Sequence, residues 1–379
     1  MSAPNWPSRN LQSDGSTTSH LNYGYQQMRY HQSTTQFNCG IDLHARSMYV
    51  CVVNPRGDVV LHQNILDNDF DFFLKKIAPF RHDLTITAEC MFAWYWLADA
   101  CAREKLSFIL AHALYLRAIH GGKNKNDRID SEKLARLLAA HLIPIAYVYP
   151  AAKRPVRALL RQRLSYVWRR SELLRRVQSM QQAEGLTPVP RCQSRNRQPW
   201  EARLLAQFPN PHHQLSVQTD LASIRHYDQM IASLEQQLVR TTRQIASRDY
   251  ALLQTVPGIG QALALTILYE VDDIGRFETV QRFSSYCRLV KGTVASAGKI
   301  KGLRGARLGN PYLRWAIGEA AVLGRRHEPR LAQWHQELCA RKGNFKANAI
   351  LANQLGRAIY FMLKNRTVFD LDEFLRAAA

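Results

Sequence analysis

The stretch F-N-C-G-I-D-L, from Phe37 to Leu43, is the first of three strand-like segments that together decide the fold. M-Y-V-C-V-V-N follows at residues 48–54, and G-D-V-V-L-H-Q follows at residues 57–63 after a turn that contains Pro55. Runs of β-branched and aromatic residues bounded by turn residues are typical of strands. The three segments therefore predict a three-stranded meander.

The segments after the meander alternate between helix and strand patterns. A helix is predicted at about 68–78, a strand from Leu84 to Glu89, a helix at about 92–104 and a strand at 107–110. A meander followed by β-α-β is the element order of the ribonuclease H-like fold, an α/β fold in which the first strand pairs in parallel with the fourth. Asp42 and Glu89 would then lie side by side at the carboxyl ends of these strands, where open α/β sheets usually place their sites.

Two further acids lie close together in K-N-D-R-I-D-S-E-K-L-A, from Lys125 to Ala135. Asp127 and Asp130 are three residues apart at the start of a predicted helix, so their carboxylates point the same way. Two neighbouring like charges repel unless a cation lies between them. With Asp42 and Glu89 they form the acid set that a Mg²⁺-dependent nuclease or transposase needs, because Mg²⁺ prefers carboxylate oxygen and can hold the attacking and leaving oxygens of a phosphodiester.

The composition indicates a globular protein that binds a polyanion. The chain has 379 residues, 46% of them hydrophobic, which is enough for two or three domains with a core. Lys and Arg number 51 against 30 Asp and Glu, which gives a formal net charge of +21. This balance is expected of a protein that neutralises nucleic-acid phosphates, although a ribosomal-type or merely soluble basic protein shares it.

The cysteines and the hydropathy indicate in which cellular compartment the protein works. The seven cysteines are scattered without a C-x-x-C pair, so we interpret them as buried thiols in a reducing cytosol and not as a zinc site or a disulfide framework. No apolar stretch approaches the length of a membrane span, and the N-terminus lacks the hydrophobic core of a signal peptide. We therefore expect a cytoplasmic protein without a membrane partner.

The middle of the chain predicts a long basic helix. Between Lys153 and Arg176 there are nine Lys or Arg residues against Glu172 alone, and an apolar helical stripe runs through them. Its arginines are candidate contacts to nucleic acid, in particular Arg161, Arg169 and Arg176.

A second helix is predicted after a Pro-rich and Arg-rich break at residues 186–211. It carries apolar or small residues three and four positions apart, which is a coiled-coil seam: Ile224, Tyr227, Ile231, Leu234, Leu238, Thr241 and Ile245. Two interpretations of this seam are equally good. It could pair two chains, or it could belong to an ordinary helical hairpin that packs on its own domain.

The last third opens on V-P-G-I-G, from Val256 to Gly260, between two apolar helix patterns. This is the helix-hairpin-helix pattern, in which Gly258 and Gly260 would let backbone N–H groups approach a phosphate. Glycine-rich turns between helices also occur for packing reasons, so the pattern alone does not decide.

Ser296 lies in a glycine-rich cationic loop that precedes a predicted helix start at Asn310. Ser296 is the only hydroxyl in the A-S-A-G-K core, and Lys299, Lys301 and Arg304 follow it closely. These basic residues could contact nucleic acid and stabilise the transition state of an attack on phosphate. A serine in such a loop is more often an ordinary loop residue than a nucleophile.

The combined motifs decide between these interpretations. The acids Asp42, Glu89, Asp127 and Asp130, followed by V-P-G-I-G, A-S-A-G-K and G-N-P-Y-L-R, resemble the DEDD transposases of the insertion-sequence one-ten family, in particular its eleven-eleven subgroup. The resemblance runs from about Phe37 to Leu323 and keeps three separate motifs in one order.

The resemblance implies an α/β plus α architecture. We expect a disordered tail at 1–36, a RuvC-like (ribonuclease H-like) DEDD domain at 37–149, a helical segment with the basic helix and the coiled coil at 150–250, and a mainly α C-terminal transposase domain with the helix-hairpin-helix-like turn and the serine loop at 251–379. The tail at 1–36 is not a family feature, and its disorder is expected from a composition rich in Ser, Thr, Asn, Gln and Tyr.

The resemblance also implies a mechanism and partners. The four acids would bind Mg²⁺, and Ser296 would attack the phosphodiester to form a covalent phosphoserine link. Family members are recombinases guided by a structured non-coding bridge RNA. The expected partners are therefore donor DNA, target DNA, the bridge RNA and further copies of the chain in a dimer or tetramer with a composite site. The expected location is the bacterial cytoplasm, in association with the nucleoid.

The chain departs from the family pattern at two positions and leaves alternatives open. Lys291 stands where the family commonly has Pro, and Ala297 stands where it has Gly, so Thr293 is an alternative nucleophile. His44 either assists the metal or is a bystander at the end of a strand. The rival functions are a metal-dependent junction nuclease without a covalent intermediate and a non-catalytic nucleic-acid-binding protein.

Overall fold

The computed structural model describes residues 29–91, 93–119, 126–189, 197–245, 248–296, 299–304 and 308–378. The chain divides into two compact units between Ala152 and Lys153. The predicted basic helix and the predicted C-terminal domain thus belong to one unit.

The first unit contains a five-stranded sheet in the order β3-β2-β1-β4-β5. β1 (Phe37–Leu43) pairs antiparallel with β2 (Ser47–Val53), which pairs antiparallel with β3 (Val59–Leu66). β4 (Leu84–Glu89) pairs in parallel with β1 and with β5 (Ser107–Ala111). The predicted meander and the predicted parallel pairing of the first and fourth strands are confirmed.

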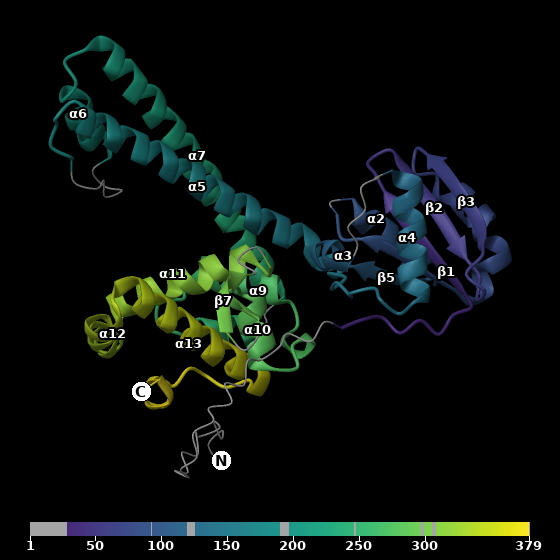
Figure 1. The fold of residues 1–379 in the computed structure, drawn as a ribbon. Coiled ribbons are helices and arrows are strands. Elements are labelled where there is room, and N and C mark those ends of the chain that lie inside the picture. The colour runs from purple at the N-terminus through teal and green to yellow at the C-terminus, as the bar shows by residue number, and fades with distance from the viewer. Residues whose placement is uncertain are drawn as a thin grey trace, which may run out of the picture. The chain divides into compact units, whose positions relative to one another are not determined.

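Helices cover both faces of this sheet. α1 (Phe70–Ile77) and α2 (Trp94–Arg103) bury apolar side chains against one face, and α4 (Asp127–Ala139) packs on β1 and β2 from the other (Figure 1). The alternation of side chains along β2 explains the two layers, because Val50 and Val52 face the first cluster and Cys51 and Val53 face Ala135 of α4. The remaining helical segments are η1 (Ala78–Asp83), α3 (Ala113–Ile119) and η2 (Ala151–Lys153).

Gly40 lets α4 lie directly on β1. A Cβ at this position would be 2.2 Å from the backbone oxygen of Ser131 and 2.3 Å from the backbone nitrogen of Ala135. Neither backbone atom can rotate away, so only glycine permits this approach of helix to strand. The approach matters because α4 begins with Asp127 and β1 carries Asp42.

We expect Gly40→Ala to lower the free energy of unfolding by about 2 kcal/mol or more, because overpacking a close helix–strand contact forces the backbone apart. Urea unfolding measured by circular dichroism checks the value. Gly318→Ala is the matched control, since nothing lies within 4 Å of the Cβ it would add. A loss no larger than that of the control would contradict the packing role of Gly40.

Part of the expected N-terminal tail is ordered against the first unit. Residues 1–28 lie outside the described part of the chain. The backbone of His31 donates to the carbonyl of Ile143, and the backbone of Ile145 donates to the carbonyl of Arg29. The polar residues that suggested disorder help to hold this segment, since Ser33 Oγ donates to Asn38 Oδ1 at 2.8 Å and Thr35 Oγ1 donates to Thr85 Oγ1 at 2.9 Å.

The second unit begins with a long pair of antiparallel helices, α5 (Arg154–Ala183) and α7 (Pro211–Ile245), joined through α6 (Arg197–Ala206) (Figure 1). The predicted basic helix is confirmed and extends beyond Arg176. Of the predicted seam, Ile224 packs in one apolar cluster with Val177, and Leu238 packs in another with Leu160. These seam positions therefore face α5 of the same chain, and the coiled coil in the strict sense stays a prediction.

Ion pairs run along the same two helices. Arg163 Nε donates to Glu235 at 2.8 Å, Arg170 pairs with Asp228 at 2.6 Å, and Arg176 Nε donates to Asp220 at 2.7 Å. Asp220 is only 2% exposed, so its charge requires the partner. We call these three pairs the charge ladder.

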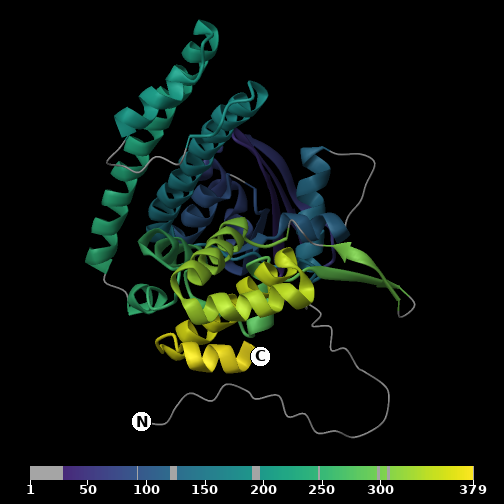
Figure 2. The same ribbon diagram turned by 90° about the vertical axis from the view of Figure 1, so that its left-hand side faces the viewer.

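The rest of the second unit is mainly helical and packs around one large apolar cluster. Its helices are α8 (Arg248–Leu253), α9 (Gln261–Val271), η4 (Ile274–Arg276), α10 (Val280–Tyr286), α11 (Pro311–His327), α12 (Pro329–Lys342), α13 (Asn344–Asn365) and α14 (Leu371–Ala378). A two-stranded hairpin, β6 (Gly292–Ser296) and β7 (Lys299–Arg304), lies between α10 and α11; Figure 2 shows it in green as a narrow ribbon.

The prediction of buried thiols holds for four of the described cysteines, Cys39, Cys51, Cys101 and Cys287. Cys339 is partly buried, Cys90 is exposed, and Cys192 lies outside the described residues. Burial raises the pKa of the Cys101 thiol to about 12. In the part of the chain that the structure describes, no helix has the length and apolar character needed to cross a bilayer.

Candidate functional site

The sheet brings two of the predicted acids to one edge. Ile41 of β1 is directly opposite Ala88 of β4, so Asp42 and Glu89 each come one residue later on neighbouring parallel strands. Both side chains are partly buried. The predicted adjacency of the two strand ends is therefore present in the backbone register.

The start of α4 supplies the other two acids. Asn126 is the N-cap residue, and its side-chain oxygen accepts a hydrogen bond of 2.8 Å from the backbone N–H of Ile129. This cap fixes the first turn, in which Asp127 and Asp130 lie on neighbouring positions of one helix face. Lys133, one turn further, donates to Asp130 at 3.2 Å.

His44 lies between two of the acids. Its Nε2 is 3.4 Å from Asp42 Oδ2 and 3.3 Å from Asp127 Oδ1. These three side chains can offer ligand atoms that all lie within 4.8 Å of one another. Glu89 and Asp130 are not members of this group of three. The sequence left the role of His44 open, and the structure places its ring at the centre of the cluster.

The electrostatics of Asp42 agree with a site that attracts a cation. Burial raises the pKa of the Asp42 carboxyl, His44 lowers it, and the negative charges of Asp127 and Asp130 raise it further. A divalent cation would relieve this repulsion, and carboxylate oxygens and an imidazole nitrogen are suitable donors. The residues present therefore fit a divalent metal ion held by Asp42 and Asp127, with His44 as the third donor.

The predicted nucleophile lies in the other unit. Ser296 is the last residue of β6, and its backbone is paired with Lys299, the first residue of β7. Arg304 pairs with Gly292 at the other end of the hairpin, and Lys301 is exposed. The side chains of Ser296, Lys299, Arg304 and Thr293 lie outside the described part of the structure, so their predicted roles stay predictions.

The base of the hairpin is closed by short contacts. The backbone N–H of Asn310 donates to the carbonyl of Tyr286 at 2.6 Å, and Arg288 Nε donates to the carbonyl of Gly309 at 2.8 Å. Gly309 has φ +92°, and a Cβ there would lie 2.4 Å from the carbonyl oxygen of Tyr286. The two ends of the serine-bearing segment are thus held together, and only glycine fits at this corner.

A buried carboxylate anchors this base to α5. Glu270 is 1% exposed and accepts from Arg161 Nε at 2.6 Å, from Arg161 Nη2 at 2.8 Å and from Asn310 Nδ2 at 2.7 Å. Asn310 Oδ1 in turn caps α11 by accepting from the backbone of Tyr312 and Leu313. The sequence patterns do not predict this network, whose only signal in the sequence is an acid inside the apolar run of α9.

The three arginines predicted to contact nucleic acid lie in different surroundings. Arg161 pairs with Glu270 and stacks on the ring of Tyr312 at 4.5 Å, and Arg176 pairs with Asp220 in the charge ladder. Arg169 is exposed and has no ion-pair partner among the described residues. Of the three, Arg169 is the one whose charge is available to a ligand.

The turn V-P-G-I-G packs against α11. Gly258 has φ +87°, and a Cβ on it would lie 2.3 Å from the backbone nitrogen of Gly324. Gly258 therefore has a packing reason to be glycine. Gly260, at the N-cap of α9, has open space where a Cβ would be, so it stays a candidate for phosphate contact.

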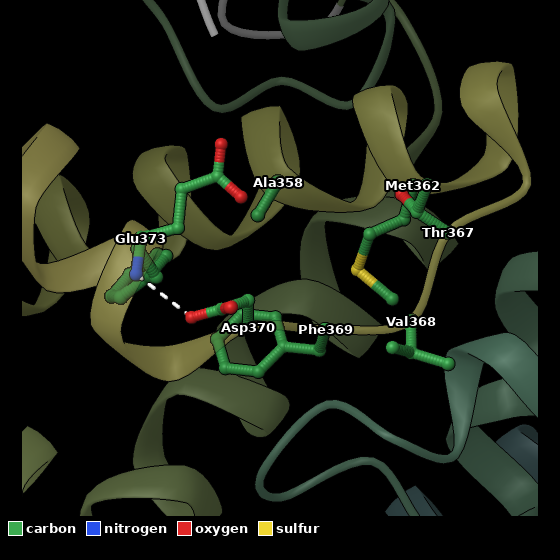
Figure 3. Close-up of a pocket in the computed structure, with 8 residues that line it drawn as sticks. Ala358, Met362, Thr367, Val368, Phe369, Asp370 and Glu373 are labelled. Carbon is green, nitrogen blue, oxygen red and sulfur yellow. Dashed lines mark hydrogen bonds between the residues drawn. The ribbon is translucent and has the colours of Figure 1, made fainter. Parts of the chain in front are cut away.

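A pocket between α13 and α14 is a separate feature (Figure 3). Its lining is mainly apolar and includes Met362, Val368 and Phe369. Asp370 is occupied by capping α14, since its Oδ1 accepts from the backbone of Glu373 at 2.9 Å. The pocket contains none of the predicted site residues, and we do not assign the chemistry to it.

Comparisons with known proteins agree with the two halves of the candidate site. Residues 39–183 match a family model of IS110-type DEDD transposases, and residues 250–336 match the model of the transposase IS116/IS110/IS902 family. The first range contains all four acids, and the second contains Ser296. The chain is also 25% identical, over 252 residues, to the transposase for insertion sequence element IS1111A of Coxiella burnetii (strain RSA 493 / Nine Mile phase I). That match covers 65% of this chain and 68% of the relative.

Proposed function

The chain belongs to the IS116/IS110/IS902 family of DEDD transposases, and from this premise we propose that it cuts and rejoins the DNA of an insertion sequence with a divalent metal ion and the hydroxyl of Ser296. The observation that carries the proposal is the meeting of Asp42, His44 and Asp127, whose ligand atoms lie within 4.8 Å of one another. Side chains from two separate elements converge there, as expected for a site that binds a cation.

The acids of the first unit, a RuvC-like domain in this proposal, would hold the metal and orient the substrate. Asp42 and Asp127 would provide oxygen ligands and His44 a nitrogen, with Glu89 and Asp130 beside them. A bound divalent ion, Mg²⁺ by our proposal, would supply positive charge to the oxygens of the scissile phosphate. The N-cap at Asn126 and the close helix–strand contact at Gly40 position the carboxylates of α4 and β1 before the substrate binds.

The serine completes the reaction in two exchanges that conserve the phosphodiester. Ser296 Oγ loses its proton and attacks the phosphorus, the bond from phosphorus to the leaving DNA oxygen breaks, and that oxygen takes up a proton. A hydroxyl of the partner strand then attacks the phosphoserine ester in the reverse sense and releases Ser296. Lys299 and Lys301, which follow Ser296 in the hairpin, supply positive charge for the transition state.

We propose donor DNA, target DNA and a structured bridge RNA as the partners, with a composite site built from more than one copy of the chain in a dimer or tetramer. Two features support this. The acids and Ser296 lie in different units, and the basic surplus of the chain is +21. A V-P-G-I-G turn with an open Gly260 adds a backbone donor for phosphate.

A cleavage assay on labelled DNA tests the proposed chemistry. We expect strand cleavage and recombinant product with Mg²⁺ and neither with EDTA. The products should include DNA covalently bound to protein on a denaturing gel. Metal-dependent cleavage without such an adduct would favour the junction nuclease, and metal-independent binding without cleavage would favour a non-catalytic binding protein.

On α5, we expect Arg169→Ala to weaken binding of nucleic acid and to reduce the slope of log affinity against log salt by about 1, because one phosphate contact is lost. The melting temperature of the Arg169→Ala variant should equal that of the wild type. Arg176→Ala, seven residues along the same helix, should lower the melting temperature instead, since it leaves the buried Asp220 without its partner. Titrations at several salt concentrations and thermal melts of both variants check the pair. Equal salt slopes for wild type and Arg169→Ala would contradict the assignment.

A further inference from the structure

The corner between α12 and α13 exposes an aromatic side chain in a strongly basic setting. Phe345, the second residue of α13, is 92% exposed, the highest value among the exposed large hydrophobic residues of the described chain. All six residues from Arg341 to Lys346 are exposed. A phenylalanine in this position gains none of the favourable free energy of burial.

The corner itself is firmly built. The backbone N–H of Gly343 donates to the carbonyl of Cys339 at 2.8 Å, and the backbone N–H of Ala347 donates to the carbonyl of Gly343 at 3.0 Å. Asn348 donates to Asn344 at 3.1 Å, and Ala347, directly after the exposed run, is fully buried. Phe345 is therefore held out from the unit by a rigid turn between two packed helices.

The charges around Phe345 are positive and available. Arg341, Lys342 and Lys346 have no ion-pair partner among the residues that the structure describes. No acid occurs anywhere in the sequence from Leu338 to Phe369, although six basic residues do. The corner contrasts with α5, where arginines are neutralised by the charge ladder. A polyanion is the ligand that fits three free cations around an apolar tip.

We propose that this corner binds duplex DNA, with Arg341, Lys342 and Lys346 on the phosphates and Phe345 as a wedge that enters between two base pairs. Apolar side chains presented among basic residues act in this way at the minor groove, where they unstack a base step and kink the duplex. A-form RNA offers a different surface, so we commit to DNA. The inference rests on the proposed function, since a recombinase must open the duplex that it cuts.

The test separates the wedge from the charges. Fluorescence anisotropy with a labelled DNA duplex, without Mg²⁺, measures affinity, and 2-aminopurine placed in the duplex reports unstacking. We expect Phe345→Ala to weaken binding about tenfold with an unchanged salt slope and to abolish the 2-aminopurine signal. Phe345→Leu, which keeps an apolar wedge, should retain most of both. Replacing Arg341, Lys342 and Lys346 together by Gln should lower the salt slope by about 2 to 3.

Controls make the outcome decisive. Leu215→Ala removes another exposed apolar side chain, 59% exposed on α7, and should change nothing. Unchanged affinity and unchanged 2-aminopurine fluorescence in Phe345→Ala would overturn the proposal. The proposal would also be overturned if Phe345→Ala weakened binding of RNA alone. It would be overturned as well if the substitution changed only the molar mass measured by light scattering, because the corner would then be a contact between copies of the chain. Because the assay needs no cleavage, a failure of the metal or serine chemistry would leave its result intact, whereas a wild type that binds no DNA would count against the proposed function itself.

Discussion

Asp42→Asn and Asp127→Asn are each expected to reduce DNA cleavage and recombination by at least about 1,000-fold. Each substitution removes one of the two carboxylates that meet at His44, and the remaining ligands cannot hold a divalent ion against the scissile phosphate. Glu89→Gln and Asp130→Asn are expected to abolish recombination as well, because we propose that all four acids act as one site. Recombination in a two-plasmid assay and cleavage of labelled DNA measure the loss.

The expected loss is one of metal binding and not of folding. Titration with Mn²⁺, followed calorimetrically, should show a binding event in the wild type that is absent in Asp42→Asn and Asp127→Asn. Asp71→Asn is a matched control, because Asp71 is an exposed acid of the same unit in the first turn of α1. Its activity and metal affinity should equal those of the wild type. Full activity in both site variants would refute the metal centre.

Ser296→Ala is expected to form no covalent protein–DNA adduct and no recombinant product, while it binds DNA and RNA as the wild type does. The reason is chemical, since a covalent phosphoserine ester conserves the energy of the broken phosphodiester and permits rejoining without an external energy source, whereas hydrolysis by water does not. The loss should equal the full catalytic effect of the site, at least about 1,000-fold. Denaturing gels of radiolabelled DNA measure the adduct directly.

Thr293→Ala is the matched variant for this prediction, because Thr293 is the other hydroxyl of β6. It should keep the adduct. An adduct that persists in Ser296→Ala and disappears in Thr293→Ala would transfer the role to Thr293. Cleavage that continues in both variants, with Mg²⁺ and without any adduct, would instead identify a nuclease that uses water.

The sequence predicted the parts of the fold that depend on local periodicity. The runs of β-branched and aromatic residues in 37–63, separated by turn residues, predicted the meander, and the strand-like stretch L-T-I-T-A-E from Leu84 to Glu89 predicted the fourth strand. The position of Asp42 and Glu89 followed from the strand order alone. In each case a short stretch carries its own signal, and the geometry of paired strands does the rest.

The roles of the basic residues could not be predicted in the same way. Arg161, Arg169 and Arg176 look alike in sequence, but Arg161 pairs with a carboxylate 109 residues away and Arg176 with one 44 residues away. Whether an arginine is available depends on such distant partners. Gly258 is a similar case, because its need for glycine comes from Gly324, which lies 66 residues later on α11. The central place of His44 also required the side chains of two elements to be known together.

The charge ladder fixes the alignment of α5 and α7. If α7 slid along α5 by one heptad, at least one acid of the ladder would lose its arginine. In one direction Glu235 would face Val156, and in the other Asp228 would face Val177 and the buried Asp220 would face Ala183. The helix pair therefore has one fixed alignment. α5 is about 35 Å long from Leu160, which packs against α9, to Ala183. A ligand bound at the far end of the pair is therefore held at a fixed distance from the helices that carry the serine hairpin.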